Sequence, residues 1–463
     1  MGKLSSFRQR LGAFIGGFEG GLSARRLKGF HASRAHVNSL IQAAGNDMTS
    51  RARFLIRNNG YAINAVESFC ANVVGTGIKP SSGIASPALK EKAQKLWLRW
   101  TDESDAEGMT DFYGQQRRAA REVFIAGEVF FRIRYRKRSD GLCVPLQLQM
   151  LPSEMLPLHD NRVLAKGHVV RQGIEFDAIG RRVAYHFHKR HPGDHTEPQM
   201  TGEQVRVPAS SVLHIIDPVE AGQLRGFSRF APVLVKLFLL DQYDDAELDR
   251  KKVAAMFAGF VRRPAGDELD KDKSESQVLP LEPGQLQILE DGEDIVFSNP
   301  SDVGGNYEAF QYRTLLQVAA GFGLPYANVS ADMLKANYSN TRAGLLEFRR
   351  RAEAFQHSVM VFQLCRTVWN AWMDMAVLSG ALRLPDYEQL HEDYVACDWL
   401  PPRWEWVDPL KDIRAEREAI DARLKSRSMS ISERGYDSST VDKEIASDRK
   451  REQELGIISE REE

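Results

Sequence analysis

The stretch GEVFFRIRYRKRSDGLCVPLQLQM, residues 127–150, is where the hydrophobic pattern changes from a helical period to a strand period. Apolar residues alternate with polar or charged ones on both sides of the turn Ser139–Asp140–Gly141, which predicts an antiparallel hairpin. Helical spacing precedes the hairpin over residues 86–126 and returns from Ser228 onwards. Helices and antiparallel strands in separate blocks predict an α+β fold.

The sequence after the hairpin predicts further strands and one unusually long helix. The strands are expected at Val169–Phe176, Arg182–His188 and Val212–Ile216. The long helix is expected at Arg342–Ser379, where apolar residues recur at spacings of three and four and Arg366 interrupts them once. Its apolar seam consists of Leu345, Phe348, Ala352, Phe355, Val359, Phe362, Trp369, Met373 and Ala376. Such a helix would be roughly 50–60 Å long, which is more than a compact domain usually needs.

Shorter helices and one irregular insertion complete the predicted elements. The insertion, Arg262–Gly305, contains four prolines and several glycines and is expected to be β-rich or irregular. Ser228 is expected to cap the helix that follows it, and Asn340 or Thr341 to cap the long helix. The shorter helices are expected at Ala62–Val74, Ser86–Trp100, Asp111–Ala126, Ser228–Phe257, Tyr307–Ala320, Lys411–Ser426 and Ser439–Leu455.

Composition limits the classes of function. The 463 residues are 43% hydrophobic and contain no apolar run of about 18 residues, so no membrane span is expected. The net charge is −1, whereas a protein that grips DNA by its phosphates is usually markedly basic. The charge therefore disfavours a tight, static DNA binder but is compatible with a channel along which DNA slides.

The cysteines and the N-terminus indicate where the chain is assembled. Cys70, Cys143, Cys365 and Cys397 are far apart and form no CxxC pair, so we expect reduced thiols and assembly in a cytoplasm. Residues 1–50 begin with a basic, glycine-rich segment that lacks a clean small-residue cleavage site. We interpret these residues as an N-terminal arm rather than a signal peptide.

Motifs that would mark an enzyme are missing from the sequence. There is no G-x-x-x-x-G-K-[ST] loop, so a nucleotide-driven motor would have to be another protein. His391–Glu392 lacks the second histidine of a zinc protease motif, and Gly226–Phe227–Ser228 does not continue as a nucleophile elbow. We therefore expect no catalytic activity and no cofactor.

Four histidines provide the alternative hypothesis. His186 and His188 would share one face of a strand, and His191 and His195 follow closely, so that a metal-dependent hydrolase is conceivable. No carboxylate or further ligand follows at a recognised spacing. We favour a polar strand end followed by a loop.

Two charged clusters also have alternative interpretations. The arginines at 132, 134, 136 and 138 lie on one face of a predicted strand; they could follow phosphates, face solvent or form salt bridges to a neighbouring subunit. The carboxylates Asp244, Asp245, Glu247 and Asp249 lie within a predicted helix. A solvated helix face is the simpler interpretation, but in a channel such acidity would repel the DNA backbone.

Several stretches, in this order and spacing, resemble the lambda family of phage portal proteins. They are Arg57–Ala62, Asn72–Ile78, Gly127–Phe130, Gly173–Asp177, His214, Gly222–Ser228, Asp241–Leu248 and Ala336–Gly344. The resemblance extends over nearly the whole chain. It implies the portal fold and a ring of about twelve subunits closed by head-to-tail contacts.

The portal architecture implies a division of the chain. The N-terminal arm at 1–50 would come first. It would be followed by a first wing segment at 51–227, a stem helix at 228–261, a clip at 262–306, a second stem helix at 307–324 and a tunnel loop at 325–342. The long helix and the segment after it, residues 343–408, would return to the wing, and residues 409–463 would form a charged, helical crown.

The resemblance also implies site residues and partners. The DNA-facing residues of the tunnel loop would be Lys335, Asn337, Tyr338, Asn340 and Arg342. Asp244, Asp245, Lys251 and Lys252 would line the channel on the stem. The partners would be double-stranded DNA, the terminase large subunit, the major capsid protein and scaffold, and head–tail connector proteins, but no membrane. The location would be the portal vertex of a virion.

Overall fold

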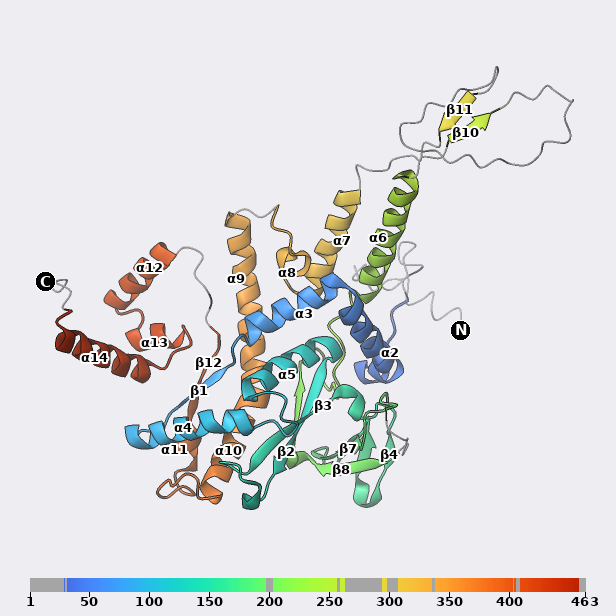
Figure 1. The fold of residues 1–463 in the computed structure, drawn as a ribbon. Coiled ribbons are helices and arrows are strands. Elements are labelled where there is room, and N and C mark those ends of the chain that lie inside the picture. Colours follow the sequence, from blue (N-terminus) through green and yellow to red (C-terminus); the bar gives the residue numbers. More distant parts are fainter. Residues whose placement is uncertain are drawn as a thin grey trace, which may run out of the picture.

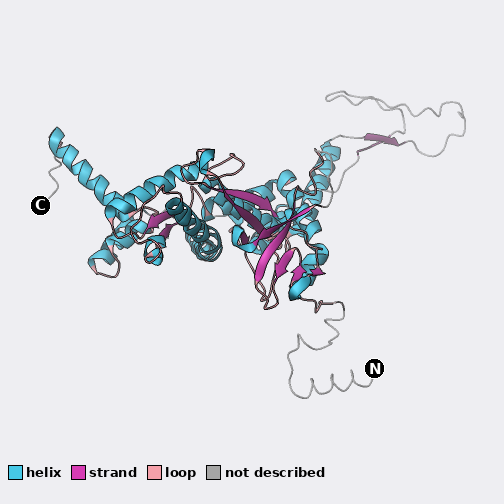
Figure 2. Cartoon of the chain, turned by 90° about the horizontal axis from the view of Figure 1, so that it is seen from below, coloured by secondary structure: helices cyan, strands magenta, loops and turns pink. Residues whose placement is uncertain are grey.

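The computed structural model describes residues 29, 31–196, 203–255, 259–262, 294–297, 307–334, 338–402, 404 and 409–457. Its body is a mixed layer of helices and antiparallel sheets, from which a pair of helices projects (Figure 1). The C-terminal helices lie on the far side of a long helix from the three-stranded and five-stranded sheets, as Figures 1 and 2 both show. The predicted α+β class is confirmed.

The central sheet contains the predicted hairpin. Strands β2 (Glu128–Tyr135) and β3 (Leu146–Pro152) pair in antiparallel register, and β9 (Val212–Ile216) pairs with the other side of β2. Val129, Phe131 and Ile133 alternate along β2 and are buried in the main core. The period of two in the sequence therefore identified the buried face of this sheet correctly.

Both edges of the central sheet are occupied. Beyond β3, the Ser104 carbonyl accepts a hydrogen bond from Leu148 N at 2.7 Å. Beyond β9, the side-chain amide of Gln363 donates to Ile216 O and accepts from Ile216 N, both at 2.8 Å. The Gln363 amide thus occupies the place that a further strand would take.

A second sheet covers the opposite face of β2 near Phe130. Its order is β4 (Arg162–Val163), β5 (Val169–Arg171), β6 (Ile174–Phe176), β7 (Arg182–His188) and β8 (Gln204–Pro208). The single strand predicted at Val169–Phe176 is wrong, because Gln172 and Gly173 adopt φ values of 51° and 80° and reverse the chain. Two successive positive φ values are typical of a tight hairpin turn, so β5 and β6 are separate strands.

Four helices pack around the central sheet: α2 (Val37–Asn58), α3 (Gly60–Val73), α4 (Pro87–Glu103) and α5 (Phe112–Ala126). Asn59 accepts a hydrogen bond from Ala62 N and caps α3, and Asp111 caps α5 in the same way. Trp97 of α4 lies at the centre of the main core, with its ring centroid 5.0 Å from those of Trp369 and Trp372. This aromatic contact joins the long helix to α4.

The long helix is continuous from Tyr338 to Leu378, as α9 (Tyr338–Phe355), a π-helix η7 (Gln356–Cys365) and α10 (Arg366–Leu378). It begins four residues before the predicted Arg342, so Asn340 and Thr341 lie inside it and cannot cap it. Phe362, predicted in the buried seam, is 60% exposed. The wider π-turn explains this difference, because it places residues at other angles than the α-helical spacing assumes.

The remaining helices and strands lie outside the two larger sheets and the long helix. The remaining α-helices in the described residues are α6 (Leu234–Ala255), α7 (Tyr307–Phe322), α8 (Tyr326–Ser330), α11 (His391–Val395), α12 (Pro409–Asp421), α13 (Arg427–Ser432) and α14 (Ser438–Leu455). The strands β1 (Lys79–Ser82) and β12 (Cys397–Leu400) pair with each other, as do β10 (Gly259–Arg262) and β11 (Asp294–Phe297). Ser228 does not cap α6, which begins at Leu234; the Ser228 hydroxyl accepts from Phe230 N instead. No helix within these ranges is long and apolar enough to cross a bilayer.

A buried ion pair fixes the segment that leads from the sheets into α6. The guanidinium of Arg225 and the carboxylate of Glu128 are both fully buried, with Arg225 Nη2 2.7 Å from Glu128 Oε1. Glu128 Oε2 accepts from Gly226 N at 2.7 Å and lies 2.9 Å from His214 Nε2. Burial alone would raise the pKa of Glu128, but Arg225 and His214 hold it well below its usual range.

Two glycines allow the chain to cross itself at this ion pair. A Cβ at Gly127 would lie 2.2 Å from Phe227 N, and a Cβ at Gly226 would lie 2.3 Å from the Gly127 carbonyl carbon. Gly127 also has φ +87°, which side chains rarely adopt. Any larger residue at either position would separate the two backbones.

We predict that Glu128→Gln lowers the free energy of unfolding by about 3–5 kcal/mol at neutral pH, because it leaves the buried Arg225 without its counter-charge. The depressed pKa of Glu128 means that its contribution is present above about pH 4.3 and is lost as the pH falls further. Urea unfolding followed by circular dichroism, at neutral pH and again below about pH 4.3, measures the effect of the substitution and its dependence on pH. Glu107→Gln, at an exposed carboxylate, is the control and should change stability by less than about 0.5 kcal/mol. Equal losses in the two variants would contradict the role given to Glu128.

Candidate functional site

The helices α6 and α7 lie side by side and project from the body (Figure 1). Leu237 and Leu240 of α6 and Val318 and Phe322 of α7 are buried at the base of the pair. The Phe322 ring packs edge-on against Phe230, at 4.8 Å between centroids. The base is therefore fixed in the core, while the outer part depends on contacts between the two helices.

Asp244 joins the outer parts of the two helices. Its carboxylate accepts from Tyr307 OH at 2.9 Å and from Gln311 Nε2 at 3.2 Å. Burial and the bond to Asp244 raise the pKa of Tyr307 to about 12. Asp245, the next residue, is exposed. The two carboxylates predicted to line the channel thus have different surroundings: Asp244 holds α7, and Asp245 faces solvent.

The two lysines predicted on the same helix are exposed and lie next to carboxylates. Lys251 Nζ lies 3.9 Å from Glu247 and 5.4 Å from the centroid of the Tyr307 ring. Lys252 Nζ lies 3.0 Å from Asp249. Since these pairs largely cancel each other's charge, this part of α6 presents no strong field of either sign.

The second exposed feature of the helix pair is apolar. Val235, Phe238 and Leu239 of α6 are 65%, 43% and 55% exposed, and Phe310 of α7 is 50% exposed. The α6 residues recur at spacings of three and four, on a different side of the helix from the buried Leu237 and Leu240. The apolar face of α6, meaning Val235, Phe238 and Leu239, was missed in the sequence because apolar residues on two sides of a helix give no single stripe.

The segment predicted as a tunnel loop is anchored at its start. The short helix α8 lies against α3, where Asn64 Nδ2 donates to the Asn328 and Val329 carbonyls at 3.2 and 3.0 Å. Asn328 Nδ2 donates to Ser68 Oγ at 2.7 Å. After α8 the chain emerges into solvent, and Leu334 is 95% exposed.

The residues predicted to face DNA lie at the other end of this segment. Lys335 and Asn337 fall outside the described residues. Tyr338, Asn340 and Arg342 lie in the first turns of α9. The predicted loop at 325–342 therefore contains α8, an exposed stretch and the beginning of the long helix.

The histidines of the alternative hypothesis do not form a metal centre in the described part of the chain. His186 is buried, with Nε2 3.0 Å from Glu175 Oε2 and Nδ1 3.0 Å from Arg162 Nη2. Arg206 also binds Glu175, and the bonds from Arg206, His168 and His186 lower the pKa of Glu175 to about 2. His191 and His195 are in or near an exposed loop, and no group of three His, Cys, Asp or Glu within the described ranges could hold a metal.

Comparison with known families identifies the chain. The model of the family described as "Phage portal protein, lambda family" matches residues 23–356, which include both sheets, α6, α7 and α8. The chain belongs to the lambda family of phage portal proteins. Its function is therefore that of a portal protein in a phage capsid, as its resemblance to that family implied.

Individual relatives agree with this assignment. The chain is 27% identical to the probable portal protein of Halomonas phage phiHAP-1, over 89% of this chain and 81% of the relative. It is 22% identical to portal protein B of Escherichia phage lambda, over 91% and 87%. Among solved structures, it shares the fold of a chain from the neck of an empty gene transfer agent particle, with a TM-score of 0.50 and 15% identity over 84% of this chain and 93% of that chain.

We predict that Asp244→Ala in this portal protein lowers the free energy of unfolding by about 1 kcal/mol, since Tyr307 and Gln311 lose their shared acceptor. Asp245→Ala, one residue further along the same helix, removes an exposed carboxylate and should have no measurable effect. Thermal denaturation, with hydrogen exchange of the α7 amides, compares the two. The prediction fails if both variants behave alike.

Proposed function

We propose that copies of this portal protein close side by side into a ring of about twelve, through which double-stranded DNA enters and leaves the phage head. The observation that carries this proposal is the apolar face of α6. It is exposed on a helix pair that projects from the body. Exposed apolar surface of this kind marks contacts between proteins. A contact between unlike surfaces of successive copies closes into a ring when the rotation allows it.

Two observations support other copies of the same chain as the partner of this face. The face is bordered on α6 by charges of both signs, which suits a surface that meets another of its own kind. The gene transfer agent neck, one of whose chains shares this fold, was computed with C6 symmetry. Cyclic symmetry in that particle supports, by analogy, a cyclic arrangement here.

Within such a ring we assign α6 and α7 to the stem and residues 262–306 to the clip. The segment 325–342 would be the tunnel loop, residues 51–227 and 343–408 the wing, and residues 409–463 the crown. The clip would dock the terminase large subunit. The outer surface would meet the major capsid protein and scaffold and, later, the head–tail connector proteins. The ring would be assembled in the host cytoplasm.

The charges of α6 suit passage of DNA rather than retention. Its lysines lie beside its carboxylates, so the phosphates would meet little net attraction there. Lys335 would supply one positive charge per subunit at the tunnel loop. We infer that the chain is not itself an enzyme, which the lack of a nucleotide-binding loop in the sequence supports.

The ring can be tested through the apolar face of α6. The double variant Phe238→Glu/Leu239→Glu should prevent assembly and leave chains of 52.2 kDa, because it places carboxylates in the proposed contact. Native mass spectrometry and negative-stain imaging measure the assembly. Leu98→Glu, at a residue of α4 that is 63% exposed, is the control and should still form rings. Rings of normal size from the double variant would exclude this contact.

The tunnel loop can be tested separately. Lys335→Glu should reduce DNA packaging or retention without affecting ring formation, because it reverses one charge per subunit where DNA passes. Packaging of a phage genome into heads built with the variant measures the effect. Lys92→Glu makes the same change at an exposed position on α4 and should package normally. Normal packaging by the Lys335 variant would show that this loop does not contact the DNA in the channel.

A further inference from the structure

The three C-terminal helices form a module, residues 409–457, that contributes nothing to the hydrophobic core. No residue of α12 or α14 is buried, and the residues of the main core all precede the module. In Figure 1 the module lies beside α4 and the ribbon of β1 and β12. Its position therefore depends on something other than apolar packing.

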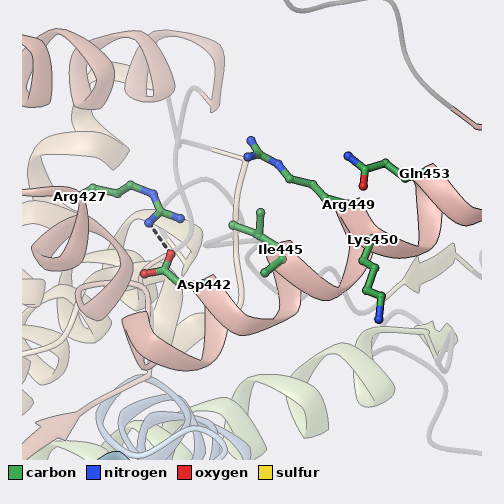
Figure 3. A pocket seen from close by; sticks show the side chains of 7 residues that line it. Arg427, Asp442, Ile445, Arg449, Lys450 and Gln453 are labelled. Atoms are coloured by element: carbon green, nitrogen blue, oxygen red, sulfur yellow. Dashed lines mark hydrogen bonds and ion pairs between the residues drawn. The ribbon is translucent and has the colours of Figure 1, made fainter.

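Polar contacts hold the module together as one body. Lys425 Nζ lies 2.9 Å from Glu416 Oε1 and also binds Glu433, which joins α12 to the end of α13. Arg427 of α13 forms an ion pair with Asp442 of α14 at 2.5 Å, drawn in Figure 3 beside Ile445. These contacts lie inside the module and would survive if it moved as a unit.

A different set of contacts joins the module to the body. The carboxylate of Asp437 accepts from Ser81 Oγ of β1 at 2.5 Å and from Lys90 Nζ of α4 at 3.0 Å. The side chains of Asp437 and Lys90 are only 19% and 24% exposed. Six residues further along the chain, in α14, Lys443 Nζ lies 3.4 Å from Glu91.

A cleft separates the two surfaces around these contacts. It has a volume of about 730 Å³ and is lined from the body by residues such as Ile84 and Pro87 and from the module by Tyr436 and Val441. Apolar side chains thus line this joint without closing it. Partly exposed ion pairs are individually weak and are screened by salt.

We propose that the C-terminal module docks reversibly on α4 and β1, and that Asp437, bound to Ser81 and Lys90, is the latch of this joint. The latch opens when salt screens it or when its charge is removed. Release frees the module as one body, with its own ion pairs kept. The latch belongs to a single chain, so its failure would leave the proposed ring untouched.

Asp437 allows the latch to be separated from the helix that bears it. Its other oxygen accepts from Thr440 N at 3.0 Å and caps α14. Asparagine caps helices as well as aspartate does. Asp437→Asn therefore keeps α14 intact and removes the charge that faces Lys90.

The test uses a carbodiimide, which joins lysine to a carboxylate only where the two are in contact. Mass spectrometry of the full-length protein compares the Lys443–Glu91 cross-link, which spans the joint, with the Lys425–Glu416 cross-link, which lies inside the module. Asp437→Asn and Lys90→Gln should each raise the equilibrium constant for undocking about two- to fivefold, the effect of losing one partly exposed ion pair. The ratio of the two cross-links should then fall in both variants. Raising NaCl from about 0.05 M to about 0.5 M should lower it in the wild type.

Arg427→Gln is the matched control, because it breaks an ion pair of the module without touching α4, and it should leave the ratio unchanged. A ratio that is insensitive to salt and to both latch variants would mean that the module is fixed, and would overturn the proposal. A Lys443–Glu91 cross-link found between two chains, seen as a band of twice the chain mass, would also overturn the proposal. The absence of that cross-link from the wild type would overturn it as well.

Discussion

The structure depends on one buried ion pair, between Glu128 at the start of β2 and Arg225 in the segment that leads into α6. Arg225 also donates to the carbonyls of Gln172 and Ser153, so a single guanidinium connects the central sheet, the second sheet and the approach to the helix pair. Such a pair adds little stability compared with well-packed apolar residues in its place. Removing one partner, however, leaves a buried charge unpaired and lowers the free energy of unfolding strongly. The pair therefore fixes the geometry of the segments that it joins more than it adds to stability. Gly127 and Gly226 allow the two backbones to touch at the same point. The direction in which α6 leaves the body is therefore set by charge and by the absence of side chains.

This constraint bears on the proposed ring, in which neighbouring copies would meet through the projecting helices α6 and α7. A small error at the root of a long element becomes a large displacement at its tip. Arg229, four residues beyond Arg225, adds a second fixed point: its guanidinium lies 4.8 Å from the Phe69 ring centroid and 5.0 Å from that of Phe355, and it pairs with Asp217. The root of α6 is thus held by three elements that are distant in sequence. The C-terminal module, by contrast, is attached to the body mainly by a few partly buried and exposed charged contacts.

Local sequence patterns predicted the parts of the fold that local forces determine. The hairpin at 127–150 and helices α4 and α5 were predicted correctly, because their periods and caps lie within each segment. The turn at Gln172 was missed because glutamine rarely adopts a positive φ, and the π-helix because spacing rules assume 3.6 residues per turn. The Glu128–Arg225 pair spans 97 positions and has no local signal. At the candidate site, the sequence found α6 but could not separate Asp244 from Asp245, since only Tyr307 and Gln311 of the neighbouring helix distinguish them. The resemblance to a family, rather than any single motif, indicated the function.

The amide of Gln363 has a consequence for how copies meet. By satisfying both backbone groups of Ile216, it occupies one position on the edge of β9 that would otherwise be open to another chain. Pairing of exposed strand edges between copies leads to open-ended aggregates. With that position capped by a side chain, the proposed ring would rely on helical surfaces, whose geometry can close on itself. A single glutamine in the π-helix thus disfavours one route to open-ended association.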